Sequence, residues 1–277
     1  MHFPRPAGPL RNARQLTIRF AYCASLAAIA VLGLTPLPFL ATKVATAEPP
    51  GWYGRVDAGF ETGTSARFRD WNCGGTDPAA IPLYGCLARA SGDFGRSAAF
   101  GGGIGYRIDE RFRIDLTVGW RPGFGFDGQA NFPVAGGQAV DGEVSTLSGM
   151  VTGYLDLAPL VALDLGPFQP FVGLGAGVSR NRLDRTTLSF PGISQTVTTP
   201  GGTSTGFAWT ATAGTGIRLT DALTLEIAYR YTDFGRVDSD RGDATRVRTS
   251  GTVSLPIDGT RSDLASHGIS IGLRHAF

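Results

Sequence analysis

Side chains alternate between apolar and polar along segments of about ten residues, and this two-residue period decides what the chain can fold into. From Phe112 to Trp120 every second residue is large and apolar, and the residues between them are polar or small. The same pattern runs from Leu223 to Tyr231 and from Ile269 to Phe277. Successive side chains of a β-strand point to opposite faces, so each segment has one face suited to lipid and one suited to water.

No apolar run after residue 47 approaches the roughly 20 residues that a membrane-spanning helix needs, whereas about ten residues suffice for a tilted spanning strand. The alternation therefore predicts an all-β fold, an eight-stranded antiparallel transmembrane β-barrel. The predicted strands span residues 51–61, 98–108, 112–122, 145–157, 169–179, 206–219, 223–233 and 266–277.

The connections between these strands alternate in length. Those near Asp109 and Thr220 are tight, and the third connection on the same side, at 158–168, is longer and fits the scheme least well. The other four are long and rich in Gly, Ser, Thr and Asp, at 62–97, 123–144, 180–205 and 234–265. Short periplasmic turns and long extracellular loops are typical of an outer membrane barrel.

A soluble β-sandwich also consists of alternating strands joined by turns, and it is the alternative fold. Aromatic rings near strand ends favour the barrel, because such rings can lie among lipid headgroups. Here these residues are Trp52, Tyr53, Tyr106, Trp120, Trp209, Tyr229, Tyr231 and Phe277.

The first 47 residues predict a cleaved signal peptide, which leaves residues 48–277 as the outer membrane barrel domain. Four arginines precede an apolar run from Phe20 to Leu40, and Ala45-Thr46-Ala47 has the small-x-small pattern that a signal peptidase recognises, with cleavage after Ala47. A permanent anchor helix is the alternative, and two prolines at the end of the apolar run favour cleavage.

Charge argues against a nucleic-acid partner. Cleavage after Ala47 would remove five cations and no acid, which lowers the 25 Lys and Arg to 20 against 23 Asp and Glu. The mature chain is then mildly acidic and has no large basic block, whereas nucleic-acid-binding proteins carry one. We therefore expect no nucleic-acid partner.

Two cysteines, Cys73 and Cys86, remain after cleavage, with twelve residues between them. In the oxidising environment outside the inner membrane they predict a disulfide, which would stabilise the fold by about 2–4 kcal/mol. A metal site is disfavoured because no His or second Cys pair lies nearby. We expect no metal and no cofactor.

The alternation also assigns seven arginines and five acids to the barrel interior. An eight-stranded barrel is just wide enough for its own side chains, and buried charges must pair or stay hydrated. The sequence therefore predicts an Arg–carboxylate network that fills much of the lumen. If water connected through it, the surplus of arginines would favour anions. The predicted network consists of Arg55, Asp57, Glu61, Arg107, Arg113, Asp115, Arg121, Asp156, Arg218, Glu226, Arg230 and Arg274.

Four stretches resemble the small Gram-negative outer membrane barrel family, which includes OmpA-like transmembrane domains and the opacity-type and immunogenic surface proteins. Gly51–Phe60 resembles the first strand, Pro170–Val178 the fifth, Tyr229–Gly235 the seventh and Gly272–Phe277 the closing strand. The resemblance implies that Phe277 serves as a recognition signal for the barrel-assembly machinery. His275 departs from the family, which more often has a large apolar residue there.

These patterns predict a structural or surface-interaction protein of the cell outer membrane that displays four extracellular loops. Outer membrane lipids and lipopolysaccharide are its expected partners, together with host or phage surface ligands. A narrow, low-conductance porin-like channel for small solutes is the alternative function. A lipid hydrolase is disfavoured, because the adjacent Ser266 and His267 point to opposite faces. We therefore predict no enzymatic activity and no catalytic residue.

Overall fold

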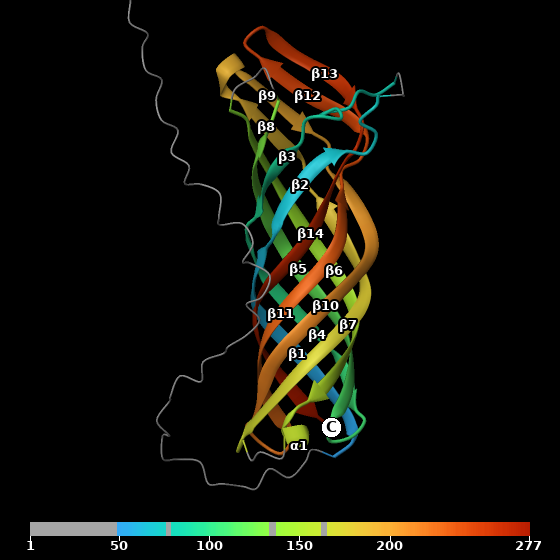
Figure 1. Cartoon of the computed structure of the whole chain (residues 1–277), viewed down its shortest axis with the longest axis vertical. Helices are drawn as coiled ribbons and strands as arrows, with labels where there is room; N and C mark the ends of the chain where they lie inside the picture. Colours follow the sequence, from blue (N-terminus) through green and yellow to red (C-terminus); the bar gives the residue numbers. More distant parts are fainter. Residues whose placement is uncertain (1–48, 76–78, 133–136, 162–164) are drawn as a thin grey trace, which may run out of the picture. The chain divides into compact units, whose positions relative to one another are not determined.

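The computed structural model describes residues 49–75, 79–132, 137–161 and 165–277, which form one antiparallel β-sheet with two short helices (Figure 1). The all-β antiparallel class predicted from the alternation is confirmed. The predicted signal peptide and its cleavage site at Ala47 lie outside the described residues. In the described part of the chain, no helix combines the length and the hydropathy needed to cross a membrane.

Eight long strands match the eight predicted segments, four of which extend one residue beyond the end of the observed strand. Neighbouring strands pair in the order β1, β4, β5, β6, β7, β10, β11, β14, and β14 also pairs with β1. The last described residue is tied to the first strand, because Phe277 N–H donates to Trp52 O at 3.1 Å. The long strands are β1 (Gly51–Gly63), β4 (Arg96–Arg107), β5 (Phe112–Ala130), β6 (Ala139–Asp156), β7 (Phe168–Leu183), β10 (Gly202–Arg218), β11 (Leu223–Asp238) and β14 (Thr260–Ala276).

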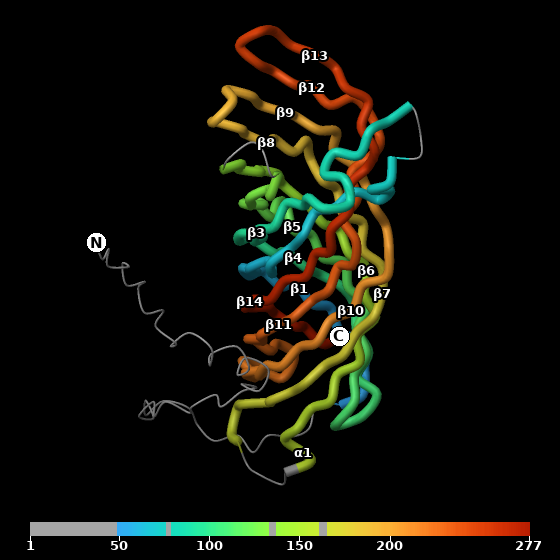
Figure 2. The backbone as a smooth tube through the Cα atoms, turned by 45° about the horizontal axis from the view of Figure 1, so that its top comes forward, coloured from blue at the N-terminus to red at the C-terminus, as the bar shows by residue number. Residues whose placement is uncertain are grey.

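Six further strands occupy segments that were predicted as loops, so the described residues contain fourteen strands where the alternation predicted eight. They continue the sheet beyond the long strands, at the end that Figures 1 and 2 show uppermost. We call this end, which carries the four long connections, the long-loop end. The six are β2 (Ser65–Asp70), β3 (Ala90–Phe94), β8 (Thr186–Phe190), β9 (Gln195–Thr199), β12 (Gly242–Arg248) and β13 (Gly251–Ile257). The helices are α1 (Ala158–Val161) and a 3-10 turn at Pro191–Ile193.

At the opposite end of the long strands, here called the short-turn end, two connections are tight, and the connection between β6 and β7 is longer and includes α1. Between β4 and β5, the backbone N–H groups of Arg111 and Phe112 donate to the Asp109 carboxylate at 2.7 and 2.8 Å. These bonds hold the pKa of Asp109 below its usual value. Between β10 and β11, the Thr220 hydroxyl accepts the N–H of Leu223 at 3.0 Å. Side chains that bond their own turn in this way specify tight reversals.

The outer face of the long strands is a band of exposed apolar side chains between two aromatic belts. Toward the long-loop end, Trp209 packs on Tyr231 with ring centroids 5.3 Å apart. Toward the short-turn end, Trp52 packs on Tyr106 at 5.1 Å. The prediction for Tyr53 was wrong: this ring is buried on the inner face, because Tyr53 has the same strand parity as Arg55.

Beyond the belt at the long-loop end, the polarity of the two faces of the sheet is reversed. The inner face becomes apolar and forms the main hydrophobic core, whereas the outer face becomes polar. This apolar layer is a defined set of buried residues: Ala66, Phe68, Tyr84, Ala88, Ala90, Phe94, Phe124, Phe126, Val140, Val144, Leu183, Leu188, Phe190, Val197, Phe234, Val237, Ala244, Ile257 and Leu264.

Two β-bulges lie at the level of this reversal. The register of β5 with β6 shifts between Arg121 and Phe124, and that of β11 with β14 shifts between Asp233 and Arg236. Each extra residue changes which alternate positions face inward. The β11 bulge requires glycine, because Gly235 has φ +69° and an added Cβ would lie 2.8 Å from a backbone oxygen.

The predicted disulfide between Cys73 and Cys86 is confirmed, with Cα atoms 4.6 Å apart. The segment that it closes is also held to β2, because the Asp70 carboxylate accepts the backbone N–H groups of Tyr84 and Gly85, both at 2.7 Å. The disulfide thus stabilises the first long connection where it leaves the sheet.

Candidate functional site

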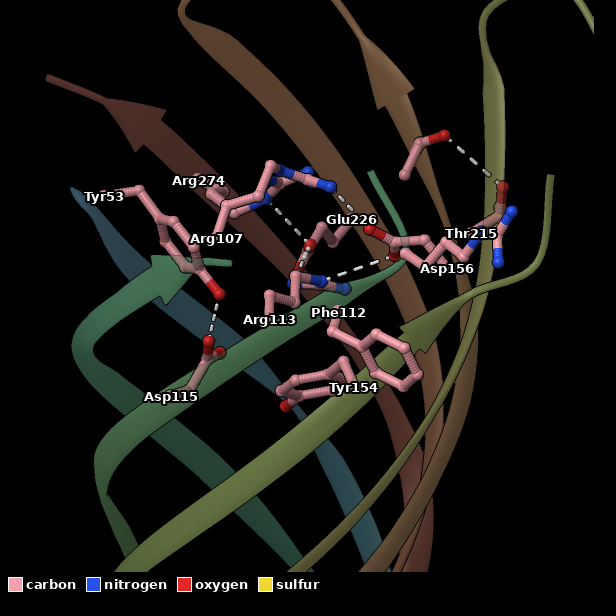
Figure 3. Close-up of polar contacts among 12 residues, drawn as sticks. Tyr53, Arg107, Phe112, Arg113, Asp115, Tyr154, Asp156, Thr215, Glu226 and Arg274 are labelled. Carbon is pink, nitrogen blue, oxygen red and sulfur yellow. Dashed lines mark hydrogen bonds and ion pairs between the residues drawn. The ribbon is translucent and has the colours of Figure 1, made fainter. Parts of the chain in front are cut away.

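A buried ion-pair network on the inner face of the long strands is the candidate site, and Glu226 lies at its centre. The Glu226 carboxylate contacts Arg113 at 2.9 Å and Arg274 at 3.1 Å (Figure 3). It also lies 3.3 Å from Arg55. Its side chain is only 3 % exposed. These contacts join β1, β5, β11 and β14, because every second residue of each strand points inward.

Two further carboxylates extend the network toward neighbouring strands. Asp156 on β6 accepts Arg107 at 2.7 Å and lies 3.4 Å from Arg113. Asp115 on β5 accepts Arg55 at 2.7 Å and also the hydroxyl of Tyr53. The network therefore links strands that are far apart in the sequence.

Aromatic rings complete the surroundings of Arg113. Its guanidinium carbon lies 4.3 Å from the ring centroid of Tyr154 and 4.6 Å from that of Phe171. A guanidinium over an aromatic face is attracted by the ring quadrupole, and the attraction is stronger away from water. Arg113 is thus held by two carboxylates and two rings.

A second cluster lies nearer the long-loop end and centres on Glu61. Arg121 binds the Glu61 carboxylate through two nitrogens, at 2.7 and 3.1 Å, and Ser266 donates to it at 2.6 Å. Arg121 also donates to Ser148 at 3.1 Å, and its guanidinium carbon lies 4.9 Å from the Phe234 ring. The cluster therefore lies directly against the apolar layer.

All twelve residues assigned to the interior lie on the inner face at low or intermediate exposure. Asp57, Arg218 and Arg230 have intermediate exposure, and the Asp57 carboxylate pairs with Arg230 at 3.5 Å. The other nine are buried: Arg55, Glu61, Arg107, Arg113, Asp115, Arg121, Asp156, Glu226 and Arg274.

Three aromatic members of the site were not among the predicted interior residues: Tyr53, Tyr154 and Phe171. Strand parity could have found two of them, because Tyr53 lies two residues before Arg55 and Tyr154 two residues before Asp156. Nothing in the sequence marked Phe171, whose ring packs edge-on against Tyr154 at 5.6 Å.

A small cavity adjoins the network. A cavity of about 30 Å³ lies between the two clusters and is lined by Asp57, Arg121, Tyr154 and Arg230, among others. That volume holds one or two water molecules. The arrangement can bind water and hold the strands together, and the apolar layer follows directly beyond it.

The outer face carries a different polar pair near the long-loop belt. The Tyr229 hydroxyl lies 3.1 Å from Nδ1 of His267, whereas the adjacent Ser266 points inward to Glu61. At the short-turn end, His275 also lies on the outer face and packs on Phe277 at 5.6 Å.

Comparison with known families decides where the chain belongs. The family model described as "Outer membrane protein beta-barrel domain" matches residues 26–277. The chain belongs to this family. As an outer membrane β-barrel protein it resides in the outer membrane, and the apolar band between the aromatic belts is its lipid-facing surface.

Relatives of this barrel protein occur in several bacteria. An uncharacterized protein of Brucella suis is 29 % identical over 201 residues, which cover 65 % of this chain and 67 % of the relative. A protein of Rickettsia massiliae named "Putative adhesin" is 30 % identical over 176 residues, which cover 62 % of this chain and 71 % of the relative.

Solved outer membrane proteins are similar to this barrel as well. The crystal structure of OprG from Pseudomonas aeruginosa has a TM-score of 0.45 and 14 % identity, and the match covers 82 % of this chain and 98 % of that one.

Proposed function

We propose that this protein is a closed eight-stranded barrel that serves the envelope as a structural and surface-interaction protein. Its long-loop end, with four loop regions, faces the outside of the cell. The eight successive pairings of the long strands, including β14 with β1, support closure. The name of the Rickettsia relative supports a surface role.

Its partners follow from its surfaces. Membrane lipids and lipopolysaccharide surround the apolar band, and host or phage ligands meet the loop regions. During biogenesis the barrel-assembly machinery recognises Phe277, whose exposed ring lies at the end of the closing strand. The placement of Ser266 and His267 on opposite faces supports a role without hydrolysis.

The main support for the proposal is that the polarity of the inner and outer faces is reversed along the same strands. Below the long-loop belt, apolar residues face outward and charges face inward, as lipid requires. Above the belt, apolar residues face inward and polar residues face outward, as water requires. The chain therefore builds a water-facing β-structure directly on its lipid-facing section, which suits display of a surface.

The interior should not conduct ions. In planar lipid bilayers bathed in concentrated KCl, the refolded protein should give no steady current, because paired charges and then the apolar layer fill the interior. Heat-modifiable gel migration provides the check that the sample is folded, and a general porin provides the positive control. Steady ohmic steps would instead support the narrow porin-like channel.

Trypsin should distinguish the two ends of the protein in whole cells. Arg248, at the tip of the β12–β13 hairpin, and Arg111, in a short turn, are both exposed. If the long-loop end faces outward, trypsin added to intact cells will cleave the peptide bond after Arg248 and leave the bond after Arg111 intact. In permeabilised cells trypsin should cleave both bonds. Cleavage after Arg111 alone in intact cells would show the opposite orientation.

A further inference from the structure

A polar hollow of about 800 Å³ lies on the outer face at the long-loop end, over β2, β3 and the start of β14. Four arginines line it, and we call it the arginine groove. Arg67 and Arg69 come from β2, Arg89 directly precedes β3, and Arg261 comes from β14.

Strand register brings these arginines together. Arg67 and Arg69 are two residues apart on β2 and therefore share its outer face. Arg261 is the direct partner of Arg69 on β14. On the other side, β2 and β3 pair as Arg67 with Ser91, and continuing that register places Arg89 beside Arg69. Side chains directly opposite on neighbouring strands are close enough to interact, and like charges there are destabilising.

Among the four arginines, the described structure gives an ion-pair partner to Arg261 alone. In the described part of the chain, Arg67, Arg69 and Arg89 have no carboxylate within the 4.0 Å of an ion pair. The Asp70 carboxylate is turned inward and bonded to backbone amides, and Arg261 is paired with Asp238 at 2.9 Å. Two further acids in the lining, Asp93 and Asp263, form no ion pair with these arginines.

A disulfide and an aromatic side chain adjoin the groove. Between its arginines, Phe68 points inward into the apolar layer, and the Cys73–Cys86 disulfide borders the groove. Trp71 lies under the Arg261 guanidinium at 4.9 Å and donates its indole N–H to Thr260 O at 3.1 Å. More than half of the Trp71 side chain remains exposed. Strand pairing and the disulfide order the backbone of the groove, so its backbone loses little freedom when a ligand binds.

We propose that the arginine groove binds a saccharide that carries phosphate or sulfate groups. Arg67, Arg69 and Arg89 bind its anionic groups, because a guanidinium matches phosphate and sulfate oxygens with two parallel hydrogen bonds. Trp71 lies outside the lining of the groove but beside Arg261, and its exposed part offers apolar area to a sugar ring. The inference rests on the proposed surface role, since the groove must face outside the cell, and it names the ligand class of that role.

The test uses the mature protein in two arms that separate the sources of such a saccharide. One arm titrates detergent-solubilised protein with dextran sulfate, and with neutral dextran as the uncharged control. The other measures binding of lipopolysaccharide and of dephosphorylated lipopolysaccharide to protein in phosphatidylcholine nanodiscs. The test variant is Arg67→Gln/Arg69→Gln/Arg89→Gln. The matched control is Arg180→Gln/Arg182→Gln/Arg185→Gln, which removes three other exposed arginines.

The wild-type protein should bind the anionic probe in at least one arm, more weakly as salt is added and not when the probe is uncharged. The groove variant should bind about 100-fold more weakly, and the control variant within about threefold of wild type. Binding in the first arm alone assigns a soluble glycan, and binding in the second alone assigns the glycolipid of the membrane itself.

Equal affinity of the groove variant and the wild type in both arms, or no binding by the wild type, would overturn the proposal. Heat-modifiable migration shows that each variant is folded. Whole-cell trypsin cleavage after Arg248 is independent of these arginines, so failure of the groove and failure of outward display are separate results.

Discussion

Replacing Glu226 with glutamine should destabilise the folded protein by about 3–5 kcal/mol, the usual result of removing one partner from a buried ion pair. Three guanidinium groups, those of Arg55, Arg113 and Arg274, lie within 3.3 Å of this carboxylate, and each of the four side chains is at most 4 % exposed. Glutamine preserves the volume and leaves the three cations without their shared acid. The measurement is denaturant unfolding of refolded protein in phospholipid vesicles.

Two comparisons isolate the electrostatic cause. Glu143→Gln, at an exposed position of β6, should change the free energy of unfolding by about 0.5 kcal/mol or less. The double variant Glu226→Gln/Arg274→Gln should lose less free energy of unfolding than the two single variants added together. The reason is that Arg274→Gln removes one of the cations that Glu226→Gln leaves without a partner. Strict additivity, or equal effects of Glu226→Gln and Glu143→Gln, would contradict a charge network centred on Glu226.

The lipid-facing half of the fold could be predicted from the sequence, because a single rule governs it there. On β5, Arg113, Asp115 and Arg121 follow the two-residue period without interruption, and the structure buries all three. What the period could not supply is the partner of each charge. Arg121 meets Glu61 and Arg113 meets Glu226 only because of the registers across several strands.

The water-facing half escaped prediction for two physical reasons. Above the belt the solvent outside the sheet changes from lipid to water, so apolar residues move to the inner face. At Pro122-Gly123 and at Gly235, bulges also change the inward parity, so the strict alternation stops at Arg121 and Phe234 although both strands continue. The two-residue period of the lipid-facing section therefore does not predict the strand residues beyond this level, and they were assigned to loops.

Tyr53 shows a conflict between two sequence rules. Its position near a strand end predicted a ring at the membrane surface, whereas its parity with Arg55 placed it inside. Parity prevailed, because the Asp115 carboxylate accepts the Tyr53 hydroxyl on the inner face. Trp52, with the opposite parity, occupies the belt.

The apolar layer leads to the second large effect, which concerns Phe234. Its side chain is fully buried, packs near Phe124 at 6.4 Å between ring centroids, and covers the Arg121 guanidinium. Phe234→Ala should cost about 3–5 kcal/mol, because the ring leaves a cavity that a rigid sheet cannot fill by collapse. Denaturant unfolding of refolded protein measures the loss.

Phe207→Ala is the matched control, because this ring is mostly exposed on the outer face and acyl chains can replace its contacts. We expect that change to cost about 1 kcal/mol or less. Hydrogen exchange should show where the loss occurs: amides of β8 and β9 above the belt should lose protection in Phe234→Ala, while amides around Glu226 keep theirs. Similar losses in the two variants, or equal loss of protection in both halves, would mean that the apolar layer is not a separate packing unit above the charge network.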